Sequence, residues 1–181
     1  MADAGRSPLN APVTEGLQPT TRPGAKPVYF EKERGVTEVQ IVRGIAHTIV
    51  TLPTENEDAA RLALLKALAS ASVPVFMVKI DSGSLSFAIR QSAIEAGEAV
   101  MNTVGYPYQM NRDLATLSIV AGAMRDLSGV MARIYEALVG QGIEVYQTGD
   151  AYNAVHCLVA GSDADKGAQA LHKAFELEAL S

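Results

Sequence analysis

The chain has 181 residues, 48% of them hydrophobic and 19% charged, which is typical of a globular protein with one ordinary domain or two small ones. Its net charge of -5 argues against a nucleic-acid or anionic-membrane partner, because both favour a basic surface. The single cysteine, Cys157, excludes an internal disulfide and a zinc site built from several cysteines. No apolar run approaches the roughly 18 residues that span a bilayer, and no signal-peptide core is present, so we expect a cytoplasmic protein.

Residues 1–35 differ in composition from the rest of the chain. They contain five of the eight prolines together with several Gly, Ser and Thr residues, and they show almost no apolar periodicity. Such a segment buries too little apolar surface to offset the entropy of ordering. We therefore predict a flexible N-terminal tail over residues 1–35.

From Gly35 onward, strand and helix patterns alternate. Val39 and Ile41 alternate with polar residues, which predicts a strand, and Gly44 is expected to break it before a second strand. Leu64 and Leu68 belong to a helical apolar stripe. The predicted elements are strands at 36–43 and 46–52, a helix at 58–72, a hairpin of strands at 73–80 and 85–90, a helix at 92–103, and a short strand at 106–110.

The same order of elements returns 70 residues later. Residues 56–78 align without a gap on residues 126–148, and apolar positions coincide almost throughout. Such an internal period is a strong guide to the fold. The second set of predicted elements is a strand at 116–121, a helix at 128–141, a hairpin of strands at 143–147 and 154–159, and a last helix at 163–175.

Each copy therefore has the order β-α-β-β-α with a possible closing strand. This order predicts an α+β fold of two ferredoxin-like βαββαβ units in tandem, each an antiparallel sheet with helices on one face. We expect the first unit at 36–110 and the second at 111–181. Two packed copies create an interface, and interfaces are frequent sites for small ligands.

The strings Leu117–Val130 (LSIVAGAMRDLSGV) and Leu171–Leu177 (LHKAFEL) give this pattern a family likeness. With two ferredoxin-like units in tandem, they resemble the C-terminal regulatory half of bacterial aspartokinases, a pair of ACT domains. The resemblance covers roughly Val36 to Leu177. The 35 preceding residues contain no P-loop and no lysine- and glycine-rich phosphate-binding segment. The resemblance therefore implies a regulatory module without the kinase domain, and we expect no enzyme activity.

The loop between the first strand and helix of the second copy is the strongest candidate for a ligand site. A helix N-terminus offers free backbone N–H groups and a favourable dipole to a carboxylate, and glycine permits close approach. An acidic side chain can accept hydrogen bonds from an ammonium group. The same loop could equally be an ordinary helix start, and that alternative stays open. The candidate residues here are Met124, Arg125, Asp126, Ser128, Gly129 and Val130.

The resemblance adds four further candidates. Asn56 holds the equivalent place in the first copy, and Asp81 ends the second strand of that copy. In the family, an effector commonly sits between the first unit of one chain and the second unit of another. That arrangement implies that Glu144 and Val145, on a strand of the second copy, face the effector.

Histidine and cysteine give no catalytic or metal pattern. His156 and Cys157 are adjacent on a predicted strand, so they point to opposite faces and cannot form a dyad. No HExxH or CxxC spacing occurs. We therefore predict no catalytic residue, no metal and no cofactor.

Two functions remain. The first is a non-catalytic regulatory protein that binds an amino-acid effector and acts by ligand-linked association in aspartate-family (lysine, threonine, methionine) biosynthesis, as a homodimer and with a separate aspartokinase catalytic subunit as a possible partner. The alternative is an interaction-only ACT module that has lost ligand binding and serves dimerisation or partner docking. Asn56 favours the alternative, because the family usually has Asp there.

Overall fold

The computed structural model describes residues 35–122, 124 and 128–177. Apart from Gly35, the expected N-terminal tail lies outside the described residues, and so do Arg125 and Asp126. The described residues all belong to one compact unit.

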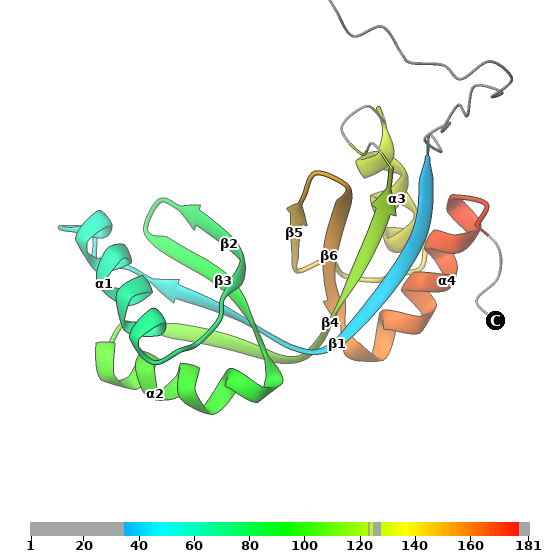
Figure 1. The fold of residues 1–181 in the computed structure, drawn as a ribbon. Helices are drawn as coiled ribbons and strands as arrows, with labels where there is room; N and C mark the ends of the chain where they lie inside the picture. The colour runs from blue at the N-terminus through cyan, green and yellow to red at the C-terminus, as the bar shows by residue number, and fades with distance from the viewer. Residues whose placement is uncertain (1–34, 123, 125–127, 178–181) are drawn as a thin grey trace, which may run out of the picture. The chain divides into compact units, whose positions relative to one another are not determined.

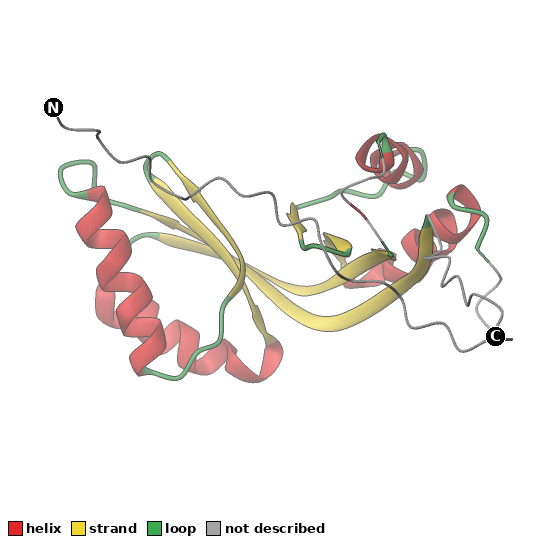
Figure 2. Cartoon of the chain, turned by 45° about the horizontal axis from the view of Figure 1, so that its top comes forward, coloured by secondary structure: helices red, strands yellow, loops and turns green. Residues whose placement is uncertain are grey.

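A six-stranded antiparallel sheet in the order β2-β3-β1-β4-β6-β5 organises the unit, with helices packed against one of its faces (Figure 1). Figure 2 shows the same arrangement by secondary structure. Two short 3-10 turns, Gln91–Ala93 and Gly161–Asp163, lead into α2 and α4. The elements are β1 Val36–Thr51, α1 Glu57–Ser70, β2 Phe76–Asp81, β3 Ser84–Arg90, α2 Ile94–Val104, β4 Tyr108–Ala121, α3 Val130–Val139, β5 Gln147–Asp150, β6 Ala154–Ala160 and α4 Ala164–Ala174.

The four predicted helices are confirmed, with ends that differ by a few residues. Leu64 and Leu68 of α1 are completely or almost completely buried, as the spacing of one helical turn requires. The hairpin strands are shifted instead. The prediction placed them at 73–80 and 143–147, but β2 begins at Phe76 and β5 begins at Gln147, and residues 73–75 and 143–146 before them have no regular secondary structure.

β1 is one continuous strand, so the expected break at Gly44 is wrong. The ladder between β1 and β4 passes from Arg43–Ala115 to Ile45–Leu114 through a β-bulge, which lets the strand continue with its faces reset. Gly44 takes a positive φ of 72° there, a conformation that glycine adopts without steric cost.

Each half of β1 belongs to a different hydrophobic core. Val39 packs with α3 and α4, and we call the part of the sheet and the helices around this core the second half. Ala46 and Val50 pack with α1 and α2, and we call the part around that core the first half. Residues 36–43 of β1 pair with 115–121 of β4, which belong to the same core. The second half is thus assembled from two segments that flank the first half in sequence.

The 70-residue period is visible in the cores. Leu64 and Leu68 of the first half have Ile134 and Leu138 as counterparts, and all four are buried to within 1% exposure. The period falls to 69 in the first strand: Ala46 pairs with Ile89 in one half, and Ala115 pairs with Val159 in the other. The second half therefore has one residue more between its first strand and its helix than the first half has. With a spacing of 70, Ala46 would be aligned with Thr116, whose side chain is on the opposite face of the sheet.

Arg43 and Arg112, which are 69 residues apart, flank equivalent kinks in the two long strands. Gly44 and Asp113 follow them with φ values of 72° and 58°. The Arg43 guanidinium donates to the carbonyl of Gly161 at 2.7 Å and pairs with Asp165 at 2.6 Å. Arg112 makes an ion pair with Glu98 of α2. Each arginine therefore ties a kinked strand to a neighbouring helix or turn.

The sheet face opposite the helices carries a small third core. Ile45, Ala88, Leu114 and Leu158 are buried there, at the centre of the sheet. The two edge strands approach each other across this face: the Gln147 side-chain amide donates to the carbonyl of Met77, and Gly149 lies against the Met77 side chain. A pocket opens on either side of this contact.

Candidate functional site

The first pocket, called here the Lys79 pocket, has a volume of about 500 Å³. It brings together β1, β2 and β3 of the first half with α3 and β5 of the second. Two predicted site residues, Asp81 and Val145, lie in its wall, although they are 64 positions apart in sequence. The lining residues are His47, Ile49, Lys79, Asp81, Ser84, Ser86, Tyr135, Val145, Tyr146, Gln147 and Thr148.

A buried hydrogen-bond network forms the inner end of the Lys79 pocket. The Gln147 side-chain oxygen lies 2.8 Å from His47 Nε2 and accepts from the Ser86 hydroxyl at 2.9 Å. Because an amide oxygen only accepts, His47 must carry its proton on Nε2. The network joins three strands, and it fixes the orientation of Gln147 at the meeting of the two edge strands.

His47 is neutral in this environment. Burial lowers the pKa of its imidazole, and the hydrogen bond with Gln147 opposes that effect only in part. The positive charge in the pocket wall therefore comes from a different residue.

Lys79 and Asp81 supply paired charges at the rim of the pocket. The Lys79 ammonium lies 3.2 Å from the Asp81 carboxylate, and both side chains are about half exposed to solvent. Exposed pairs of this kind contribute little to stability. The contact between Lys79 and Asp81 can therefore be broken at little cost, and each side chain can pair with a group of opposite charge on a ligand.

Arg61 fixes Asp81 relative to helix α1. Its guanidinium donates to the main-chain carbonyl of Asp81 at 3.2 Å, and it also pairs with Asp58 at 2.5 Å and Glu57 at 3.5 Å. The acidic start of α1 is therefore partly neutralised by Arg61, and the end of β2 is held against it.

The predicted loop residues do not line this pocket. Asn56 precedes α1 and is exposed, and its side chain makes no capping hydrogen bond. Met124 and Val130 are buried in the second core, where they pack and are withdrawn from solvent. Ser128 and Gly129 are exposed, with Gly129 at a φ of 77° just before α3. Glu144 is exposed and lies outside the pocket wall.

Sequence reasoning missed His47, Lys79, Ser86 and Gln147. Their signal was available in the alternation of the strands: each lies on a strand at a position that points away from the helices, and three of them are buried polar residues. Buried polar side chains are hydrogen-bonded, so several on one face of a sheet indicate a shared network. The single sequence did not show which strands would meet.

Cys157 and His156 are adjacent on β6 and lie in separate environments. Burial raises the pKa of the Cys157 thiol to about 12, so it is protonated and unreactive at neutral pH. Its neighbour His156 faces the opposite side of the sheet, as predicted. Within residues 35–122, 124 and 128–177, no group of three or more His, Cys, Asp or Glu side chains could hold a metal ion. No helix in that part of the chain has the length and apolar character to cross a membrane.

The family model of the ACT domain matches residues 109–173. This part of the chain is similar to ACT domains. The match begins in β4 and ends in α4, so it covers most of the second half and supports the assignment of the ferredoxin-like fold.

Curated relatives extend the likeness to most of the chain. Aspartokinase 1 of Bacillus subtilis (strain 168) is 25% identical over 143 residues, which cover 76% of this chain and 35% of the relative. The aspartokinase of Mycobacterium tuberculosis (strain H37Rv) is 30% identical over 189 aligned residues, which cover 93% of this chain and 44% of the relative. The chain thus spans less than half the length of these relatives.

Solved structures show the same fold. A crystal structure of aspartokinase alpha and beta subunits matches with a TM-score of 0.73 at 21% identity, covering 79% of this chain and all of the matched chain. The ligand-free regulatory subunit of aspartate kinase from Thermus thermophilus matches with a TM-score of 0.70 at 21% identity, covering 80% of this chain and all of that chain. The predicted resemblance to the tandem ACT-domain regulatory region of aspartokinases is confirmed.

Proposed function

We propose that this chain is a non-catalytic regulatory module of the aspartokinase type that binds a free amino acid in the Lys79 pocket. The observation that carries the proposal is the meeting of Asp81 and Val145, from different repeats, in the wall of one cavity with Lys79. It is supported by the regulatory subunits among the matched structures. On this proposal the protein works in the cytoplasm, in a pathway of aspartate-family amino acids.

The chemistry of the pocket suits a zwitterion. An α-amino acid carries a carboxylate and an ammonium on one carbon, and Lys79 and Asp81 present the two complementary charges 3.2 Å apart. The ligand would replace the exposed ion pair by two charge-assisted contacts of its own. Ile49, Tyr135 and Val145 offer apolar surface to the ligand side chain, and Ser84 and Thr148 offer hydroxyl groups.

Regulation would follow from association. A ligand that binds one arrangement of the protein more tightly than another stabilises that arrangement. Where only one arrangement binds the ligand, the stabilisation is RT ln(1 + [L]/Kd). We propose that the protein forms a homodimer and that a separate aspartokinase catalytic subunit is its physiological partner. Asn56, Ser128 and Gly129, which are exposed at the two helix starts, remain candidates for ligand contacts contributed across a dimer. Glu144, which is exposed just before β5, is also a candidate for such a contact. Arg125 and Asp126 are candidates as well.

A thermal-shift series tests the proposal, with lysine, threonine, methionine, meso-diaminopimelate and aspartate each added at millimolar concentration and molar mass followed by light scattering. A ligand at 100 times its Kd adds about 2.7 kcal/mol to the free energy of unfolding, which for a chain of this size raises Tm by about 5 to 10 °C. Lys79→Gln and Asp81→Asn should each abolish the shift. Lys66→Gln, on the exposed side of α1, is the matched control and should leave it intact.

The interaction-only alternative has its own support. Met131, Tyr135 and Val139 are exposed at intervals of four residues along α3, between 43% and 54%. Such a stripe is typical of a surface that packs against another protein. If none of the five amino acids shifts Tm and the molar mass is that of a constant dimer, the alternative replaces the sensor. An assay with aspartate and ATP is expected to show no phosphoryl transfer.

A further inference from the structure

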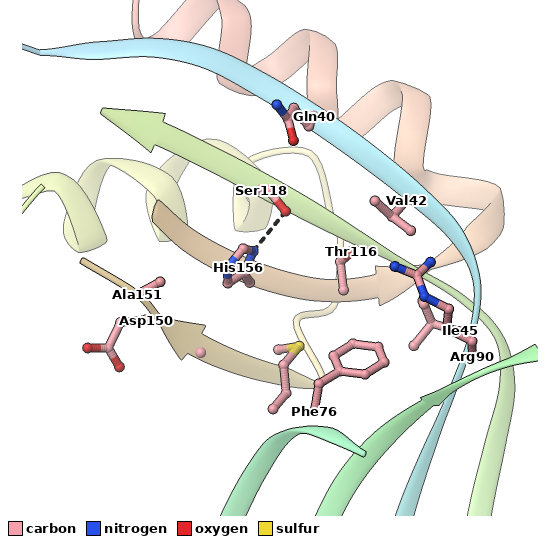
Figure 3. A pocket seen from close by; sticks show the side chains of 12 residues that line it. Gln40, Val42, Ile45, Phe76, Arg90, Thr116, Ser118, Asp150, Ala151 and His156 are labelled. Carbon is pink, nitrogen blue, oxygen red and sulfur yellow. Dashed lines mark hydrogen bonds between the residues drawn. The ribbon is translucent and has the colours of Figure 1, made fainter. Parts of the chain in front are cut away.

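A second cavity, of about 460 Å³, lies on the same helix-free face, on the other side of the contact between β2 and β5 (Figure 3). We call it the Arg90 pocket. Val42, Ile45, Phe76 and Met77 give it apolar walls, and its volume lies within the range of roughly 300 to 1,000 Å³ that is usual for small-molecule sites.

The repeat relates this pocket to the Lys79 pocket position by position. Thr116 occupies the place of His47, 69 residues earlier, and His156 occupies the place of Ser86, 70 residues earlier. The charged pair has no counterpart, however. Gly149 and Ala151 stand where Lys79 and Asp81 stand in the other pocket. The Arg90 pocket thus lacks the adjacent opposite charges that suit an α-amino acid.

Arg90 brings a positive charge to this pocket from the end of β3. Its guanidinium points over the cavity toward Thr116 in Figure 3. It takes part in none of the ion pairs among the described residues. Guanidinium groups bind carboxylates through two parallel hydrogen bonds, so an unpaired one at the mouth of an apolar cavity favours an anionic ligand.

The other polar groups of the pocket leave that charge uncompensated. Ser118 Oγ and His156 Nδ1 are hydrogen-bonded at 2.8 Å, and burial lowers the pKa of His156, so the imidazole is neutral near pH 7. Asp150 lies at the far side of the cavity from Arg90, and in Figure 3 its carboxylate points away from His156.

We propose that the Arg90 pocket is a second ligand site, which takes a small organic carboxylate with an apolar body and no α-ammonium group. The carboxylate pairs with Arg90, and the apolar body lies against Val42, Ile45, Phe76 and Met77. Ser118 and Thr116 offer hydroxyl groups to a polar substituent on the body. The proposal rests on this cavity alone and stands or falls independently of amino-acid binding in the Lys79 pocket.

The test is calorimetric titration of the full chain with 4-methylpentanoate, a branched aliphatic carboxylate. We expect saturable binding, weakened about tenfold or more in Arg90→Gln, because a charge-assisted bidentate contact is lost. Arg90→Lys should bind more tightly than Arg90→Gln and less tightly than the unaltered protein, since lysine keeps the positive charge but cannot form two parallel hydrogen bonds to the carboxylate. Lys79→Gln is the matched control in the other pocket and should leave the affinity unchanged.

Three results would overturn the proposal. They are no saturable binding of 4-methylpentanoate to the unaltered protein, equal binding of 4-methylpentanoate by the unaltered protein and Arg90→Gln, and a loss of affinity in Lys79→Gln as large as that in Arg90→Gln. The amine 4-methylpentylamine, which has the same body and the opposite charge, is expected not to bind. Folding of each variant is checked by its urea unfolding midpoint, which an exposed arginine should hardly change.

Discussion

The two halves of the sheet match on the side that meets their helices and differ on the side that does not. Leu68 and Val73 of the first half correspond to Leu138 and Ile143 of the second, all buried and apolar. On the opposite face, Lys79 corresponds to Gly149. Packing against a helix restricts a position to a hydrophobic residue of suitable volume, whereas a position in a pocket is restricted only by its ligand. The comparison therefore separates positions that hold the fold from positions free to change specificity.

The largest effect should come from truncating equivalent core residues. Leu68→Ala and Leu138→Ala should each lower the free energy of unfolding by about 2 to 5 kcal/mol, because each leaves a cavity in a fully packed core. Urea unfolding measures both. If the two halves are energetically equivalent, the two losses should be similar in size. A loss near zero in one variant would show that its half is loosely packed.

Alanine substitution of the equivalent helical glycines Gly97 and Gly167 should change stability differently in the two halves. A Cβ at Gly167 would lie 2.7 Å from Leu117 Cδ1, whereas a Cβ at Gly97 would lie 3.0 Å from Ile89 Cδ1. We expect Gly167→Ala to destabilise by about 1 to 2 kcal/mol through overpacking of a buried leucine. For Gly97→Ala, the gain in helix propensity of about 1 kcal/mol should offset most of the smaller clash. Equal midpoints for the two alanine variants in urea would contradict this prediction.

Acid should lower the free energy of unfolding through His47 and His156, one in each pocket. Burial lowers the folded-state pKa of His47 and His156 below the ordinary value of 6.5, so the unfolded chain binds more protons than the folded chain below that pH. The contribution of these groups to stability is complete above pH 6.5 and decreases as the pH falls toward their folded-state pKa values. Urea unfolding between pH 8 and 5 should show this decline.

Replacement of the histidines gives the control for that titration. In the double variant His47→Gln, His156→Gln, the part of the decline between pH 6.5 and 5 that comes from these groups should disappear, because glutamine does not titrate. A decline of unchanged size would assign the acid sensitivity to the carboxylates instead.

The smallest effect should come from the arginines beside the strand kinks. Arg43→Ala and Arg112→Ala should each cost up to about 1 kcal/mol, since the side chains of the two ion pairs are between 31% and 73% exposed to solvent. Arg43→Ala should cost slightly more, because its side chain also donates to the carbonyl of Gly161. In 1 M salt the two variants should approach the unaltered protein in urea midpoint. A salt-independent loss would point to packing by the arginine stems.

Much of the fold could be predicted from the sequence, because a repeat doubles the evidence for each element. Helix α1 and its counterpart α3 were both visible in the stripes of Leu64 and Ile134. The continuity of β1 could not be predicted. Gly44 reads as a break in any local pattern, and only the pairing of β1 with β4 along its length shows that it is a bulge.

The positions of the candidate site residues could be predicted only in part, for a physical reason. The resemblance pointed to Asp81 and Val145, which share a cavity, whereas the candidate loop before α3 included Met124 and Val130, whose side chains fill the second core. A loop that starts a helix contributes both buried and exposed side chains within a few residues, and a single sequence does not separate them. The alternation of the strands places Lys79 and Gln147 on the helix-free face, but their meeting in one pocket depends on the approach of the two edge strands, which a single sequence does not show.

The bulged strand β1 also sets an order of events as the chain is made. The core around α1 and α2 is built from a continuous stretch, so it can close as soon as that stretch is synthesised. Val39 must wait for Ile119, its partner 80 positions later, before the other core gains its outer strand. Contacts of such long separation form late because their loop-closure entropy is paid first. The first half can therefore fold while residues 36–43, which precede it in the sequence, still have no strand to pair with.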